Sequence, residues 1–280
     1  MESCDLHLHS VFSDGTHTPE EIVALGRSKN FSLLALTDHD TVDGLPRFHE
    51  AARKAGLRSL SGIEITAQIG NREVHVLGYD FDPRNDNLCR EMVLQRKNRK
   101  DRIGRMVSRL QNLGIRITVE DVLATGGTGS LGRPHVGMAL VALKVVNTVD
   151  EAFAKYLGND GPAYVDKPRL TTARAIGLIN DAGGVAVLAH PALARVDSSI
   201  GNMVREGLGG IEVVHVSHDE SAVRKYRRMA AELGLSQTGG SDCHGMTKGH
   251  VLLGHVRFPL EECERMLRRR RTPVPPAGGV

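Results

Sequence analysis

Two stretches of this 280-residue chain alternate short apolar segments with helical patterns, and this alternation constrains the fold more than any other feature. The expected strands cover residues 4–8, 31–40, 57–66, 72–80, 185–191, 210–216 and 235–244. The expected helices cover residues 18–29, 44–55, 171–182 and 219–233, the first beginning with a capping box of Thr18 and Glu21. Short strands alternating with helices of this length predict parallel βαβ units.

The middle of the chain has a different pattern. From about residue 85 to residue 160 it shows successive helical segments, and none of them predicts a strand. The simplest interpretation is an α/β barrel-like fold with a helical insertion between its fourth and fifth strands. We therefore expect barrel segments over residues 1–84 and 164–270, a helical cap over residues 85–163 and a flexible tail over residues 271–280.

The first helix of this middle region, expected over residues 88–113, contains the basic sequence RKNRKDRIGR. A run of charge on one helix face is most often solvated, so residues 96–109 are expected to face water. The functional alternative is contact with an RNA backbone, which added salt would weaken.

The composition is that of an ordinary water-soluble protein, with 40% hydrophobic and 25% charged residues. The formal net charge of +3 is too small to require a nucleic-acid partner. No apolar run approaches the ~18 residues of a membrane span, and the first residues lack the basic and then apolar pattern of a signal peptide. The four cysteines lie far apart without a CxxC pair. We expect a cytoplasmic protein with no membrane association and no obligate protein partner.

Imidazole and carboxylate side chains gather where the expected strands end. The chain has 13 histidines, and its metal-capable residues near strand ends are His7, His9, Asp38, His39, Asp40, Glu64, His75, His190, Asp242 and His244. Each alone has an ordinary explanation, such as a turn cap or a solvated charge. In parallel α/β barrels the carboxyl ends of the strands meet at one rim, so these groups are expected to lie together. Mixed nitrogen and oxygen ligands suit Zn²⁺, Mn²⁺ or Fe²⁺ rather than Ca²⁺.

Six segments of the chain together resemble a known family. They are DLHLHSVFSDGTHTPEE, ALTDHDTVDGL, GIEIT, VHVLGYD, AVLAHP and GSDCH, and their order resembles the PHP (polymerase and histidinol phosphatase) family over residues 4–82 and 165–258. Within it the chain looks most like stand-alone bacterial phosphoesterases that remove the 3′-phosphate from nucleoside 3′,5′-bisphosphates, whose relatives also degrade short RNA from the 5′ end. The helical insertion and its segment GRPHVGMAL favour that branch over histidinol phosphatases.

The resemblance implies a distorted seven-stranded (β/α)7 barrel with three divalent metal ions, Mn²⁺ being the expected ion and Zn²⁺ or Fe²⁺ the alternatives. It implies that the first ion is bound by His7, His9, Glu64 and Asp242, the second by Glu64, His75 and His190, and the third by Asp14, His39 and His244. Asp5 is expected to lie behind these ligands and to orient a histidine through its other ring nitrogen, a role that Asp38 and Asp40 could share.

The implied chemistry is phosphoester hydrolysis by in-line attack of a metal-activated hydroxide, without a side-chain nucleophile. Donors for a second phosphate are expected in the insertion and after the strand at 210–216, at Arg133, His135 and His218, with Tyr164 and Lys167 as further candidates. His215 is expected to be a packed or hydrogen-bonded histidine rather than a functional one.

Two other interpretations stay open. One is a phosphatase for histidinol phosphate or another small phosphomonoester. The other is a regulatory module that binds metal or a nucleotide without catalysis, although a complete set of ligands argues against loss of activity.

Overall fold

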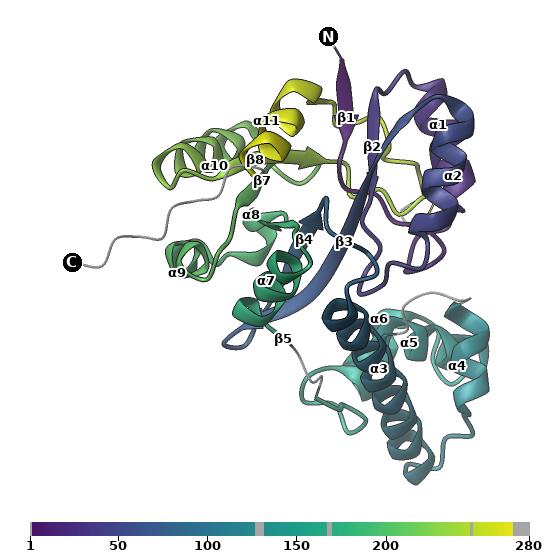
Figure 1. Cartoon of the computed structure of the whole chain (residues 1–280). Helices are drawn as coiled ribbons and strands as arrows, with labels where there is room; N and C mark the ends of the chain where they lie inside the picture. Colours follow the sequence, from purple (N-terminus) through teal and green to yellow (C-terminus); the bar gives the residue numbers. More distant parts are fainter. Residues whose placement is uncertain (1, 127–131, 167–169, 247–248, 271–280) are drawn as a thin grey trace.

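The computed structural model describes residues 2–126, 132–166, 170–246 and 249–270, which have a mixed α/β fold (Figure 1). Within these residues nine strands form one sheet in the order β8-β7-β6-β4-β3-β2-β1-β9, with β5 paired to β3. The strands are β1 (Ser3–Asp5), β2 (Leu33–Leu36), β3 (Arg58–Ile69), β4 (Arg72–Tyr79), β5 (Leu170–Thr171), β6 (Val185–Leu188), β7 (Gly210–His215), β8 (Ser236–Gly240) and β9 (Phe258–Pro259). The tail expected over residues 271–280 lies outside the described residues.

The sheet curls into a nearly closed barrel. Its ends meet just after β1, where the N–H of Leu6 donates to the carbonyl of Gly239 in β8 (3.2 Å) and Leu8 forms a parallel bridge with Cys243. Seven strands have three or more residues, and the described sheet gains only the two-residue strands β5 and β9 beyond them. The predicted distorted seven-stranded barrel is confirmed.

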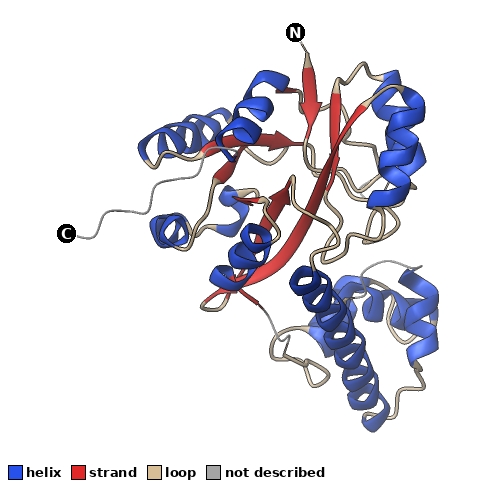
Figure 2. Ribbon diagram, in the orientation of Figure 1, coloured by secondary structure: helices blue, strands red, loops and turns tan. Residues whose placement is uncertain are grey.

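Helices surround the barrel, along its outside and at one end (Figure 2). They are α1 (Pro19–Ser28), α2 (Leu45–Ala55), α7 (Thr172–Asp181), α8 (Pro191–Ala194), the 3₁₀ turn η2 (Asp197–Ser199), α9 (Ile200–Arg205), α10 (Glu220–Glu232) and α11 (Leu260–Arg270). The capping box of α1 forms as predicted, because the Thr18 hydroxyl accepts from the N–H of Glu21 and the Glu21 carboxylate accepts from the N–H of Thr18. Among the described helices, none has the length and apolar character to cross a bilayer.

The expected parallel βαβ units do not include β4. This strand is antiparallel to both of its neighbours, and its hairpin with β3 pairs Ile69 with Arg72. Only Gly70 and Asn71 separate the two strands, and so short a turn can join only antiparallel strands. Gly70 has a φ of +54°, a left-handed conformation that glycine adopts without strain. The two-residue Gly-Asn turn therefore makes β3 and β4 an antiparallel hairpin within an otherwise βαβ-type pattern.

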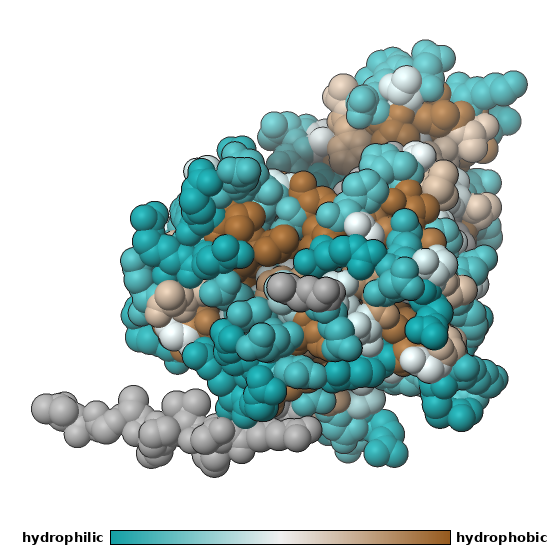
Figure 3. Space-filling view, turned by 90° about the horizontal axis from the view of Figure 1, so that it is seen from above, coloured by the Kyte–Doolittle hydropathy of each residue, from teal (hydrophilic) through white to brown (hydrophobic). Residues whose placement is uncertain are grey.

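Alternate residues of the barrel strands belong to two separate hydrophobic clusters. In β2, Leu34 packs in the cluster that contains the surrounding helices, whereas Ala35 belongs to a second cluster with Cys263 and Met266 of α11. α11 therefore closes the interior at the end of the barrel where the chain enters. Viewed from this end, the surface is mostly hydrophilic with hydrophobic residues between (Figure 3). Burial on both faces explains why β2 is a continuous apolar run.

The chain between β4 and β5 forms a group of helices below the barrel in Figure 1. These are α3 (Asp86–Asn112), α4 (Val119–Gly126), α5 (Arg133–Ala142), α6 (Val149–Ala152) and the π-helical turn η1 (Phe153–Leu157). They share their own hydrophobic cluster, to which Met106, Leu110, Val136 and Leu140 contribute. Described elements of this region are helical, as the sequence pattern predicts. The division into barrel and cap at residues 84 and 163 stays a prediction.

Part of the basic face of α3 contacts the barrel instead of water. Arg99 pairs with Asp40 and donates to the Thr66 hydroxyl (3.1 Å), and Arg96 pairs with Asp43. The expectation that residues 96–109 face water is therefore wrong for Arg99, which is only 16% exposed, and for the buried Arg102, which donates to the carbonyl of Val165 (2.8 Å). Arg96 stays exposed, as expected. The contact between Arg99 and Asp40 places the helical group at the rim formed after β2 and along the second half of β3.

Candidate metal centre and active site

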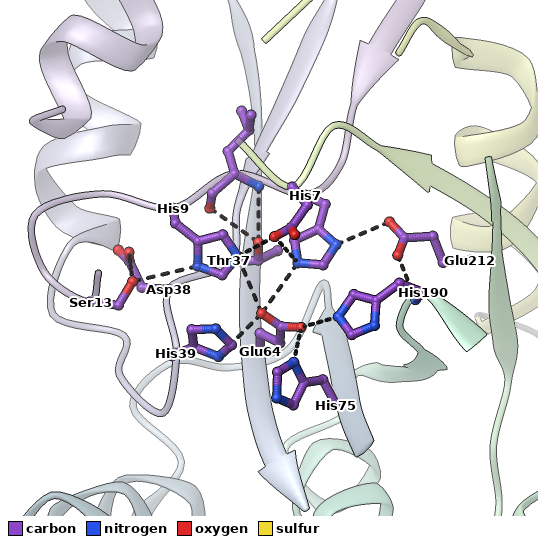
Figure 4. Close-up of polar contacts among 12 residues, drawn as sticks. His7, His9, Ser13, Thr37, Asp38, His39, Glu64, His75, His190 and Glu212 are labelled. Carbon is purple, nitrogen blue, oxygen red and sulfur yellow. Dashed lines mark hydrogen bonds and ion pairs between the residues drawn. The ribbon is translucent and has the colours of Figure 1, made fainter. Parts of the chain in front are cut away.

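All nine residues expected to bind metal lie at this rim, six of which are labelled in Figure 4. His7, His9 and Asp14 follow β1, His39 follows β2, Glu64 lies in β3, His75 in β4, His190 follows β6, and Asp242 and His244 follow β8. His75 is in the first half of its strand. It reaches the same rim because β4 runs opposite to its neighbours and pairs His75 with Thr66 of β3.

The Glu64 carboxylate is the centre of the cluster and is only 1% exposed. Its two oxygens divide the surrounding imidazoles into two groups. Oε2 lies 3.3 Å from His7 Nε2, 3.2 Å from His9 Nε2 and 3.2 Å from His39 Nδ1. Oε1 lies 2.9 Å from His75 Nδ1 and 3.2 Å from His190 Nε2. A carboxylate with imidazole nitrogens beside both of its oxygens is suited to bridge two cations.

Two further carboxylates flank this arrangement. Asp242 Oδ1 lies 3.5 Å from His7 Nε2 and 3.3 Å from His9 Nε2, on the side of Glu64 Oε2. Asp14 Oδ1 lies 3.3 Å from His244 Nε2. The cluster thus combines three carboxylates with imidazoles from different parts of the chain.

Four ring nitrogens of the cluster are buried without a hydrogen-bond partner among the described residues, namely His190 Nδ1, His7 Nε2, His9 Nε2 and His39 Nδ1. The last three face Glu64 Oε2. A buried polar atom without a partner costs free energy, which a bound cation would offset. The mixed imidazole and carboxylate donors fit divalent ions such as Zn²⁺, Mn²⁺ or Fe²⁺.

The potential ligand atoms fall into groups that differ slightly from the expected sets. Atoms within 4.8 Å of one another belong to His7, His9, Glu64 and Asp242, to His9, Asp14, His39 and His244, and to His39, Glu64 and His75. A fourth group, outside the expected sets, is formed by His7, Glu212 and His215. The first group is the set expected for the first ion. His9 belongs to both the first and the second group, and His39 to both the second and the third. His190 belongs to none of these groups, although its Nε2 lies close to Glu64 Oε1. The assignment of ligands to individual ions stays a prediction.

The cluster strongly shifts the pKa values of its members. Burial opposes ionisation of Glu64, yet the surrounding histidines, foremost His39, hold its pKa well below the usual range. Burial likewise opposes protonation of His9, but the nearby carboxylates of Asp242 and Glu64 raise its pKa to about 10. The carboxylates are therefore ionised, and their charge favours cations in the site.

Asp38 supports the ligand loop after β1. Its carboxylate accepts from the N–H of Ser10 (2.7 Å) and from the hydroxyl of Ser13 (2.7 Å), and Ser13 Oγ lies 3.5 Å from His9 Nδ1. Asp38 thus acts on His9 through Ser13. Asp40 instead joins β3 to α3, because its carboxylate accepts from the N–H of Thr66 (2.9 Å) and pairs with Arg99.

Asp5 makes a different contact from the one expected. Its carboxylate accepts from the backbone N–H groups of His7 (3.3 Å) and Ser241 (2.9 Å) instead of holding a histidine ring. The ring of His7 points away towards Glu64, and its Nδ1 lies 3.0 Å from Glu212 Oε1. Glu212 therefore occupies the place that the sequence interpretation gave to Asp5.

Sequence reasoning missed Glu212 and undervalued His215, both on β7. His215 is buried and hydrogen-bonded as expected, with Nδ1 accepting from the N–H of Ser217 (3.0 Å), but its Nε2 also lies 3.6 Å from Asp242 Oδ2. The signal for Glu212 was an acid inside the otherwise apolar strand GIEVVHV. A buried acid needs a partner, so this position was informative.

Two of the substrate-binding candidates, Arg133 in the insertion and Tyr164 just after it, contact each other. Arg133 donates to Asn159 Oδ1 (2.9 Å), and its guanidinium lies over the rings of Phe153 and Tyr164. Burial lowers the pKa of His135, and the charge of Asp14 opposes this shift. The Nδ1 of His135 accepts from the N–H of Gly132 (3.1 Å).

The other two candidates have different outcomes. The buried His218 has its Nδ1 2.9 Å from the carbonyl of Val213, and its ring centroid lies 5.4 Å from that of His215. Its Nε2 has no partner among the described residues. Lys167 lies outside the described residues.

Comparisons with known proteins agree with this arrangement. The PHP domain family matches residues 5–124. The chain is 33% identical over 262 residues to a 3′,5′-nucleoside bisphosphate phosphatase of Chromobacterium violaceum, covering 91% of this chain and 92% of that protein. It is 30% identical over 248 residues to a 5′-3′ exoribonuclease of Haemophilus influenzae, covering 86% and 89% of the two chains.

A solved structure gives the same result in three dimensions. A protein of Bifidobacterium adolescentis, assigned as a metal-dependent phosphoesterase, superposes with a TM-score of 0.83 at 36% identity and 96% coverage of both chains. The site has the donor set of a divalent-metal centre, and the similarity extends over nearly the whole chain. The chain belongs to the PHP family, and it is a hydrolase that acts on phosphoester bonds.

Proposed function

We propose that this enzyme removes the 3′-phosphate from nucleoside 3′,5′-bisphosphates. The observation that carries the proposal is the buried Glu64 carboxylate with imidazoles on both oxygens, at a rim contacted by the helical insertion. The substrate class is supported by the similarity to the Chromobacterium violaceum phosphatase over 91% of the chain.

The proposed metal complement is three ions, with Mn²⁺ the expected one, held by the nine residues of the cluster. Bound divalent cations would neutralise phosphoryl oxygens and lower the pKa of the attacking water. Glu64, as the shared carboxylate, holds the ligand groups on its two sides at a short separation. No side-chain nucleophile is needed in this scheme.

The helical insertion provides the groups that would recognise the second phosphate. The charge of Asp14 acts on the pKa of His135, and Arg133, at the start of the same helix, carries a guanidinium that can form paired hydrogen bonds with a phosphate. Its present partners, Asn159 Oδ1 and the carbonyl of Leu157, are neutral groups that a phosphate could replace. His218 lies on the opposite side of the cluster, beside His215. These contacts would allow the enzyme to discriminate between a bisphosphate and a monophosphate substrate.

A second candidate activity is the shortening of small RNA from its 5′ end. Besides the Haemophilus influenzae relative, one observation favours it: Lys97, Lys100 and Arg105 are exposed along α3, the helix that reaches the rim through Arg99. Such a row of cations could contact successive phosphates of a strand, and added salt would weaken that binding.

The test is a substrate panel with purified protein and Mn²⁺. We expect phosphate release from adenosine 3′,5′-bisphosphate to stop at AMP, with slower shortening of a 5′-phosphorylated oligoribonucleotide. Turnover of histidinol phosphate alone would contradict the nucleotide assignment. Metal binding without turnover of any substrate would favour a regulatory module.

A pair of matched variants controls this panel. Glu64→Gln removes the bridging charge with little change in shape and should abolish turnover and lower metal content. Glu50→Gln makes the same change at an exposed residue of α2 that pairs with Arg53, and it should leave both unchanged.

A further inference from the structure

Glu212 is a carboxylate in the barrel wall with no place among the nine proposed ligands. It lies in β7 and is fully buried. A buried charge is tolerated only when it is paired and hydrogen-bonded, so the contacts of Glu212 indicate its use. They are made to two residues of the metal cluster that come from different strands.

An irregularity in β7 directs Glu212 and His215 to the same side. These residues are three apart, a spacing that places side chains on opposite faces of a regular strand. The pairing with β8 shifts between Glu212 and Val214, so that Glu212 is opposite Thr238 and Val214 is opposite Gly239. Such a β-bulge inserts one residue and redirects the side chains that follow, often beside an active site. It lets β7 present both polar side chains to the cluster.

The first contact of Glu212 fixes the ring of His7. Glu212 Oε1 lies 3.0 Å from His7 Nδ1, and an ionised carboxylate only accepts, so this contact favours the tautomer with hydrogen on Nδ1. This keeps Nε2, the nitrogen that faces Glu64 Oε2 and Asp242 Oδ1, available as a ligand atom. Histidines that bind metals are commonly oriented in this way.

The second contact fixes the backbone of His190. Glu212 Oε2 accepts from the N–H of His190 at 2.8 Å. His190 has a φ of +25°, a backbone conformation that residues other than glycine rarely adopt. From this turn its Nε2 reaches Glu64 Oε1 at 3.2 Å. One oxygen of Glu212 therefore holds a residue on one side of Glu64, and the other oxygen holds a residue on the opposite side.

We propose that Glu212 is a positioning residue for two neighbouring metal subsites. One of its carboxylate oxygens fixes the ring of His7, and the other fixes the backbone of His190. The inference rests on the metal centre of the proposed function but does not depend on which phosphoester is cleaved. It predicts that loss of one oxygen weakens metal binding without any change in the ligands themselves.

Glu212→Gln tests this directly, because an amide offers one acceptor oxygen where the two contacts need two. Thr238→Val is the matched control: it is an isosteric change at a fully buried residue opposite Glu212, whose hydroxyl has no hydrogen-bond partner among the described residues. Zn²⁺ and Mn²⁺ affinities are measured by chelator competition, and folding is checked by circular dichroism. We expect about 10- to 100-fold weaker binding in Glu212→Gln, partial recovery in Glu212→Asp, and no change in Thr238→Val.

The orientation of His7 is read separately by NMR of Zn²⁺-loaded protein labelled with ¹⁵N-histidine. The wild-type protein should show His7 with hydrogen on Nδ1 and metal on Nε2, and Glu212→Gln should lose or shift this Nδ1–H signal. Unchanged affinity and an unchanged signal in Glu212→Gln would overturn the proposal.

If Glu212→Gln does not fold, the wild-type spectrum and the metal affinity of Glu212→Asp test the proposal instead. Metal bound to His7 Nδ1 in the wild-type protein would overturn the proposal, and so would a wild-type metal affinity in Glu212→Asp. A wild-type protein that binds metal but cleaves no bisphosphate would instead contradict only the proposed function.

Discussion

At the scale of single residues, the site is organised around one carboxylate whose two oxygens face different histidines. Most of these residues could be predicted from the sequence, because the family motifs occur with their order intact. Glu212 could not, because its role depends on where a β-bulge directs it and on which rings lie opposite. A motif identifies ligands, whereas the groups that orient them are determined by packing.

Arg133 is the residue at which substrate recognition is best tested. We expect Arg133→Ala to raise the KM for adenosine 3′,5′-bisphosphate about tenfold or more, since a charge-assisted contact to phosphate contributes about 1.5–3 kcal/mol. Metal content should stay the same, because Arg133 lies in the insertion. Steady-state kinetics and metal analysis check this, with Arg116→Ala as an exposed control in the same region. Loss of metal in Arg133→Ala would show that the assigned role is wrong.

His49 provides a pH dependence that is separate from the metal cluster. Its ring lies between the hydroxyls of Ser59 (2.8 Å) and Ser61 (3.0 Å), and partial burial lowers its pKa. The folded state therefore binds the proton less tightly than the unfolded state. The stability contributed by neutral His49 is present above about pH 6.5 and is lost as the pH falls through the lower, folded-state pKa.

We expect an NMR titration to place the pKa of His49 below about 6.5. His49→Gln should reduce the loss of unfolding free energy on acidification, whereas His250→Gln, at an exposed site, should leave it unchanged. A His49 pKa above the ordinary histidine value would contradict this assignment.

At the scale of elements, the capping box of α1 is the local signal that the structure reproduces most directly. Thr18→Ala should lower the free energy of unfolding by about 1 kcal/mol, because an N–H of the first turn of α1 loses its acceptor. Urea denaturation measures the change. Ser28→Ala, at the other end of α1, should change stability by less than about 0.5 kcal/mol. Equal effects of the two substitutions would argue that the cap contributes nothing specific.

The hairpin of β3 and β4 shows where element-level reasoning failed. The strands themselves were expected, but their relative direction was not, although Gly70 and Asn71 form a recognisable two-residue turn. The βαβ rhythm of the flanking segments favoured a parallel arrangement. A turn of two residues is the stronger signal, because chain geometry leaves it only one solution. This direction is also what brings His75 to the rim.

At the scale of the whole molecule, the ligands come from both arms of the chain, from His7 to His244. Divalent ions that bind only the folded protein should therefore stabilise all of it, by about 2.7 kcal/mol at a free concentration 100 times Kd. Treatment with EDTA should lower the melting temperature, and added Mn²⁺ should restore it. Glu64→Gln should show a much smaller response. A melting temperature that does not depend on metal would contradict assembly of the site from these residues.

The barrel and its helical insertion could be predicted because hydrophobic periodicity and family motifs are both patterns of residues that are close in the sequence. The contacts between them could not. The basic residues of α3 looked like a solvated face, and only the folded chain shows Arg99 beside Asp40 and Thr66. Which cations of a helix pair with a distant carboxylate depends on how two units pack, and a single sequence contains little information on this.

The closure of the barrel also has a consequence for how the protein is made. Asp5 accepts a hydrogen bond from Ser241, 236 residues further along the chain, at the seam where β8 meets the segment after β1. During synthesis on a ribosome, one edge of β1 must wait for almost all of the chain before its partner emerges. Asp242 and His244, two of the nine proposed ligands, belong to the same late part of the chain. Metal loading is therefore expected late, after the last strands have joined the first.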